Sequence, residues 1–258
     1  MNRQKIIYSF LILFILSLGV GLFYQRMRAQ TAFSDFLRLH QLTQHDIQYK
    51  TKELSFGGSG IILYQVQLPQ FKIAHKIDKL IIRQDEGTVT LQMQGLKIDI
   101  LQTLNNYYGK NIIKAVQNYV PFEDALQKPF VSLGLMGFDT IKGDAVFILN
   151  PTQNPTQING KIHLPSLADI QLSFPVETIR DADYRENLFY LGYGNVPEIT
   201  VEIQDAGLFA AYVHYLKQLG QEDALIYAKE LSKHQDFMRH IKFNTPIKLT
   251  PFYQEVFY

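Results

Sequence analysis

A run of nineteen uncharged residues near the N-terminus constrains this chain more than any other feature. The run extends from Ile6 to Tyr24 and is mostly aliphatic and aromatic. As a helix it would be about 28 Å long, close to the hydrocarbon thickness of a bilayer. The sequence therefore predicts a transmembrane helix whose residues include Ile6, Leu11, Phe14, Leu18 and Tyr24.

A cleaved signal peptide is the alternative interpretation of this run. Its apolar core usually has about 7–15 residues, followed by small residues at the cleavage site. Ser17 and Gly19 could serve there only weakly. The length of the run favours an uncleaved anchor.

The flanking charges bear on the orientation of the predicted anchor. The α-amine, Arg3 and Lys5 precede the run, and Arg26 and Arg28 follow it. Because positive charge is enriched on the cytoplasmic side, this slight excess favours a cytoplasmic N-terminus.

We expect two parts, a cytoplasmic tip with the anchor (1–28) and an exported domain (29–258). The exported part carries 21 basic against 24 acidic residues. Both Asn-x-Thr sequences, at Asn150 and Asn154, contain proline and cannot accept an N-glycan. These features favour a single-pass protein of a bacterial inner membrane with its C-terminal domain in the periplasm.

Composition excludes several classes of protein. Hydrophobic residues make up 47% of the 258 residues and aromatic residues 13%, which excludes a disordered chain. The absence of cysteine excludes disulfide scaffolds, zinc ribbons and cysteine nucleophiles. A net charge of +1 argues against a general nucleic-acid binder.

Periodicity predicts an α+β fold with a mainly antiparallel sheet, flanking helices and a C-terminal helix pair. The helical segments are 31–43, 99–121 with a break at Gly109, 208–219 and 225–237. The strand segments are 47–56, 61–68, 79–83, 89–100, 131–137, 144–149, 158–164, 168–175 and 199–203.

Three local signals refine this prediction. The parity of apolar residues changes at Gly95, which is typical of a β-bulge. The repeat Asn-Pro-Thr-Gln over 150–157 predicts an exposed hairpin tip. The segment 241–258 alternates between apolar and polar residues and predicts an edge strand or packed tail.

No motif predicts catalytic, cofactor-binding or metal-binding residues. The seven histidines form no His-Glu-x-x-His pair. Asp181 and Asp183 are followed by Tyr184 rather than by the further ligands of a calcium loop. Ser59 lies in a glycine-rich turn between strands and lacks the second glycine of a nucleophile elbow.

Bulky apolar side chains on two predicted hairpins form a candidate apolar-ligand face. They are Ile61, Leu63, Val89, Leu91 and Met93. If the helices cover one face of the sheet, the other must be polar or bind something. The alternative is that all of these residues belong to the core.

Three segments resemble membrane-anchored proteins of the Gram-negative envelope, as in the AsmA-like group and related periplasmic families. The first, 133–147, reads Leu-x-x-x-Gly-Phe-Asp-x-Ile-Lys-Gly-Asp-Ala-x-Phe. The second, 158–174, contains Leu-Pro-Ser-Leu-Ala-Asp-Ile, and the third, 203–209, reads Ile-Gln-Asp-Ala-Gly-Leu-Phe. The resemblance implies one N-terminal span, a repetitive antiparallel sheet, no enzymatic activity and, in larger members, an apolar sheet face that carries lipid.

These observations predict a non-enzymatic bitopic envelope protein whose sheet binds an apolar ligand, such as a lipid, or a protein partner. One alternative is a scaffold subunit of an envelope assembly. Another is a hydrolase without a recognisable motif, which would need His163 or His214 beside a carboxylate in a pocket. No cofactor and no nucleic acid are expected.

Overall fold

The computed structural model describes residues 3–39, 43, 45–55, 59–69, 73–109, 129–178, 194–218, 220, 225–226 and 236–248. The side chains of residues 3–18, 39, 129, 236–239 and 243–248 fall outside this description. The side chains of Ile6, Leu11, Phe14 and Leu18, predicted to lie in the membrane span, are among these. Where side chains are described, no helix is both long and apolar enough to cross a membrane.

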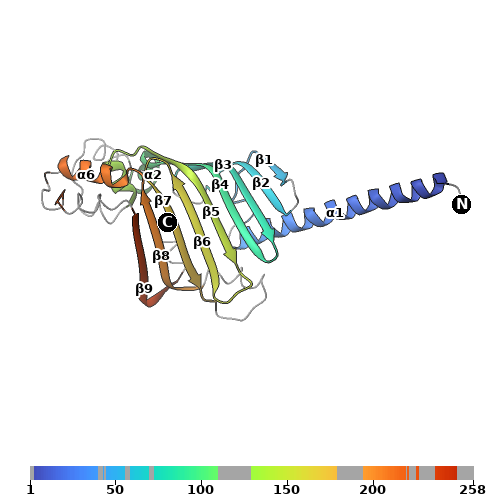
Figure 1. The fold of residues 1–258 in the computed structure, drawn as a ribbon. Helices are drawn as coiled ribbons and strands as arrows, with labels where there is room; N and C mark the ends of the chain where they lie inside the picture. Colours follow the sequence, from blue (N-terminus) through green and yellow to red (C-terminus); the bar gives the residue numbers. More distant parts are fainter. Residues whose placement is uncertain are drawn as a thin grey trace.

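Nine strands form one antiparallel sheet in which spatial order equals chain order, so each strand pairs with the next (Figure 1). This confirms the α+β class and the mainly antiparallel sheet. The strands are β1 (Thr51–Leu54), β2 (Gly60–Val66), β3 (His75–Asp85), β4 (Thr88–Asp99), β5 (Thr140–Asn150), β6 (Thr156–Leu164), β7 (Ala168–Val176), β8 (Asn195–Asp205) and β9 (Asp236–Lys248).

The two irregularities predicted from the sequence are confirmed. The register between β4 and β5 shifts between Met93 and Leu96, and Gly95 has φ of +63°. The Asn-Pro-Thr-Gln repeat forms the turn between β5 and β6, with Thr152 to Pro155 exposed.

The long helix α1 (Arg3–Leu39) is continuous through the uncharged run and the segment beyond it. Its C-terminal turns bury Ala29, Ala32, Phe33, Phe36 and Leu37 against β2 and β3. The spacing of these residues places them in one stripe, because positions three and four apart share a helix face. Burial therefore begins at Ala29, the first residue of the predicted exported domain.

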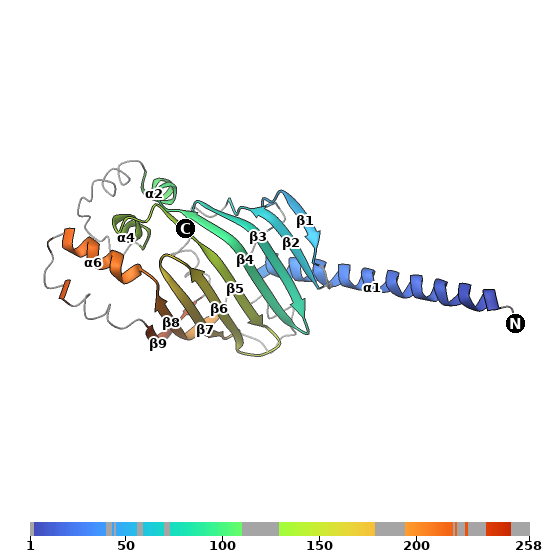
Figure 2. The same cartoon turned by 45° about the horizontal axis from the view of Figure 1, so that its top comes forward.

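Three short helices form a second core at one end of the strands (Figure 2). They are α2 (Ile100–Tyr108), α4 (Pro129–Leu135) and α6 (Leu208–Gln218). Ile100, Val131 and Tyr215 bring one buried side chain from each helix into this cluster. Asp99 caps α2 by accepting a hydrogen bond from the Gln102 N–H at 2.8 Å.

Three sequence predictions were wrong in detail. The segment 131–137 was expected to be a strand, but Val131 to Leu135 belong to α4. Phe237 was expected in the second helix of a C-terminal pair, but it lies in β9, opposite Ile203. The segment 31–43 was expected to be a separate helix, but residues 31–39 continue α1. The rest of the predicted pair, 227–235, and the second piece of the 99–121 helix lie outside the described residues.

Packing of α1 on the sheet makes a direct stability prediction. Phe36 is 2% exposed, so Phe36→Ala should lower the free energy of unfolding by about 3–5 kcal/mol. Phe23→Ala is the matched control on the same helix, because Phe23 is 65% exposed, and it should change stability by less than about 0.5 kcal/mol. Denaturant unfolding of the full chain in detergent, followed by circular dichroism, measures both. Equal effects of the two substitutions would contradict this packing.

Candidate ligand-binding face

One face of the sheet is apolar over most of its width. Directly opposed residues of neighbouring antiparallel strands point to the same side of a sheet. One such row, from β2 to β8, comprises Ile61, Ile82, Leu91, Phe147, Gly160, Leu172 and Val201. The next row comprises Leu63, Leu80, Met93, Ala145, Ile162, Ile170 and Ile203. We call the side on which these rows lie the apolar face.

The predicted ligand-face residues lie on the apolar face, in the part that α1 covers. Ile61, Leu63, Val89 and Leu91 are at most 3% exposed and share a core with α1, and Met93 packs against that core. These five side chains are therefore core in this structure. The sequence placed these residues on one face of the sheet but could not show how far the helix reaches across it.

Beyond α1, the apolar face continues over β5 to β8. An α-helix with its side chains is about 10–12 Å wide, whereas nine strands about 4.8 Å apart span roughly 40 Å. On β5 and β6, Ala145, Leu149 and Ile158 are buried. Several other apolar side chains on β5 to β8 are partly buried. They are Phe147, Ile162, Ile170, Leu172, Phe174, Ile199, Val201 and Ile203.

Gly160 lies on β6 in the middle of this part of the apolar face, between Phe147 on β5 and Leu172 on β7. A Cβ atom at position 160 would lie 2.9 Å from Leu172 Cγ and 2.9 Å from Phe147 Cδ1. Glycine thus lets both side chains lie over the backbone of β6.

The opposite face of the sheet is polar and holds one histidine that the hydrolase hypothesis required. His163 is directly opposite Asp144 on β5 and Asp169 on β7, and its Nδ1 atom contacts Asp169 Oδ1. These residues line a shallow cavity of about 300 Å³. The described lining residues include no serine or threonine, so this pair could orient a base but has no hydroxyl nucleophile.

Two further histidines lie on other described elements. His240 Nδ1 lies 2.9 Å from Thr200 Oγ1, and its Nε2 lies 3.2 Å from Glu198 Oε2, on the exposed surface of β8 and β9. His214 lies on α6, 3.2 Å from the Gln218 amide nitrogen. Among the described residues, no group of three His, Asp or Glu could hold a metal ion.

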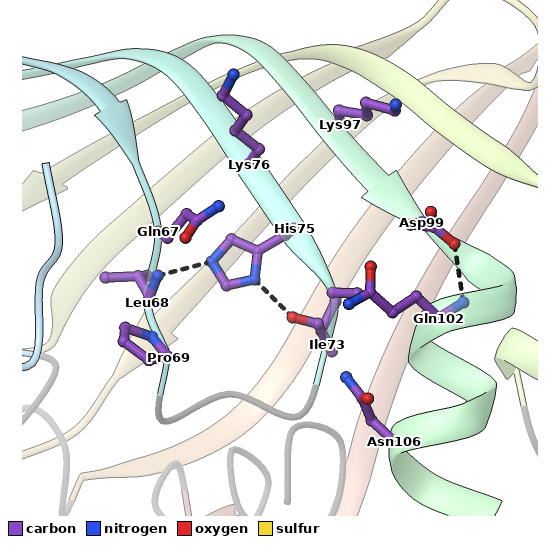
Figure 3. A pocket seen from close by; sticks show the side chains of 11 residues that line it. Gln67, Leu68, Pro69, Ile73, His75, Lys76, Lys97, Asp99, Gln102 and Asn106 are labelled. Atoms are coloured by element: carbon purple, nitrogen blue, oxygen red, sulfur yellow. Dashed lines mark hydrogen bonds between the residues drawn. The ribbon is translucent and has the colours of Figure 1, made fainter. Parts of the chain in front are cut away.

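A third feature is a cavity of about 310 Å³ between the β2–β3 connection and α2 (Figure 3). His75 fixes one wall of this cavity. Its Nε2 accepts a hydrogen bond from the Leu68 N–H at 3.2 Å, and its Nδ1 donates to the Ile73 carbonyl at 2.8 Å. Both bonds need the neutral imidazole, and burial lowers the pKa of His75 although the bond to Ile73 opposes this.

The chain was compared with known proteins. No protein-family model matches it, and neither the curated proteins nor the solved structures include a significant match.

The lowered pKa of His75 predicts a pH-dependent loss of stability. Because the unfolded chain binds the proton more readily, the stabilisation by neutral His75 is complete above the ordinary pKa of about 6.5 and is lost as pH falls below it. His75→Asn removes this titration. The difference in unfolding free energy between wild type and variant should therefore shrink from pH 8 to pH 5. Denaturant titrations at each pH measure this difference, and a constant difference would contradict the assignment of a neutral buried imidazole.

Proposed function

We propose that this chain is a non-enzymatic, single-pass protein of the bacterial cell envelope. In this proposal, residues 1–28 form the cytoplasmic tip and the anchor in the inner membrane. The sheet stands in the periplasm, and its apolar face over β5 to β8 holds the acyl chain of a lipid.

The uncharged run and the turns that follow it support the anchor. Residues 6–24 carry no charge, and their backbone belongs to the single helix α1. Phe23, Tyr24 and Met27 are 65%, 56% and 55% exposed and precede the first buried turn. Exposed large apolar side chains on consecutive turns of a projecting helix favour contact with a membrane or another apolar surface.

The partly buried apolar side chains over β5 to β8 are the observation that carries the lipid proposal. No charged residue lies on the apolar face between the rows of Ala145 and Phe174 on β5, β6 and β7. A protein partner is usually met by a surface with a polar rim and hydrogen-bonding groups. A surface built from aliphatic and aromatic groups alone matches an acyl chain better, since a chain of methylenes makes no hydrogen bonds.

Neighbouring residues on β7 allow a matched test. Ile170 points to the apolar face and is partly buried, whereas Gln171 points to the polar face and is exposed. Ile170→Asp should reduce crosslinking of the full chain to a diazirine-bearing fatty acid by about tenfold. The lost contact of one isoleucine is worth about 1.5–3 kcal/mol, which corresponds to tenfold or more in affinity.

Gln171→Asp adds the same carboxylate to the same strand and should leave crosslinking unchanged. Lipid that surrounds the anchor contributes equally to both variants, so the comparison isolates the sheet. Ile170→Thr provides a milder substitution if the aspartate prevents folding. Equal crosslinking of both faces would contradict the proposal.

A further inference from the structure

Four cationic side chains gather at the edge of the domain from which α1 projects. Arg26 and Arg28 lie on the turns of α1 just before its packed part, and Lys50 and Lys52 lie at β1. The Lys52 ammonium is 5.8 Å from the centroid of the Phe33 ring, which places β1 beside α1. β1 is also the edge strand on the side of the sheet from which α1 projects (Figures 1 and 2). We call these four residues the basic edge.

The carboxylates near the basic edge have other partners. Asp35 is 1% exposed and lies 4.0 Å from Arg38. Asp46 accepts hydrogen bonds from the Thr43 N–H and hydroxyl, both at 2.7 Å, and Glu53 accepts one from the Tyr64 hydroxyl at 3.2 Å. The two hydrogen bonds from Thr43 also lower the pKa of Asp46.

The side chains of the basic edge are free of carboxylate partners within the part of the chain that the structure describes. Arg26, Lys50 and Lys52 are exposed. Arg28 is partly buried, with its guanidinium 5.2 Å from the centroid of the Tyr24 ring. Their charges therefore remain available to an anion outside the protein.

Helix geometry places the basic edge within reach of a bilayer surface. Phe33, beside Lys52, lies nine positions after Tyr24 at the end of the uncharged run, which corresponds to about 14 Å of helix. The polar layer of a bilayer adds about 5–8 Å to each side of its hydrocarbon core. Electrostatic attraction then extends over a Debye length of about 8–10 Å. Arg26 and Arg28 would lie in the headgroup layer, and Lys50 and Lys52 within one Debye length above it.

We propose that the basic edge binds the anionic headgroups of the bilayer and holds the β1 side of the sheet against the membrane. This inference rests on the proposed anchor but not on lipid binding by the apolar face. Zwitterionic lipid would not substitute, because juxtamembrane lysine and arginine are attracted by net negative surface charge.

The absence of tryptophan provides a clean probe. Tyr49→Trp places the sole indole next to Lys50 in the full chain, at a position that is 37% exposed. Ile148→Trp, at a position 39% exposed on the polar face of β5, is the matched control. Both proteins are reconstituted into nanodiscs that contain headgroup spin-labelled lipid as a quencher, with or without anionic phospholipid.

Anionic lipid should increase quenching at position 49 by about twofold or more, and raised ionic strength should reverse the increase. Adding Lys50→Gln and Lys52→Gln should abolish it, and position 148 should not respond. The inference would be overturned if quenching at position 49 were the same with and without anionic lipid, or the same with and without the two lysine substitutions. A chain that does not co-purify with nanodiscs would overturn the anchor and this inference together, whereas fatty-acid crosslinking tests the apolar face separately.

Discussion

The packing of one helix on one side of a wide sheet determines how the remaining surface is organised. The stripe of Ala29, Ala32, Phe33, Phe36 and Leu37 seals the apolar face over β2 and β3. At the other end of the strands, α2, α4 and α6 form a separate core. The buried core that contains the α1 stripe also includes residues of β5 to β8, and further apolar side chains on these strands are partly buried. The proposed lipid site consists of these partly buried side chains.

Continuity of α1 gives the same helix a second role. Its buried turns begin at Ala29, only five residues after Tyr24, and no loop separates them from the uncharged run. If the run lies in a membrane, the helix fixes the distance between the bilayer and the sheet. The β1 side then lies nearest the membrane, where Arg26, Arg28, Lys50 and Lys52 have no carboxylate partner among the described residues. Both proposals thus depend on one rigid connection, yet they concern different surfaces.

Local patterns predicted most of the sheet. Alternation and turn residues identified the hairpins, and the change of parity at Gly95 identified the bulge. The secondary structure of short apolar runs was harder to predict, because seven residues such as 129–135 fit a buried strand or a helix equally well. Phe237 fitted a helical spacing, but pairing of β9 with β8 determines its conformation, and such distant pairing has no local signal. The reach of α1 over Ile61 and Leu63 is likewise a tertiary contact.

The proximity of His163 and Asp169 is also a result of strand pairing. The two residues meet because β6 and β7 pair in one register, and a shift by one residue would place them on opposite faces. Sequence could name His163 as a candidate but not its partner.

Native mass spectrometry of the full chain, purified from bacterial membranes, tests lipid binding most directly. After detergent is stripped from the protein, the lipid-binding proposal predicts a discrete phospholipid or fatty-acid adduct in stoichiometric amount. A spectrum that contains only the mass of the polypeptide would contradict lipid binding by the apolar face.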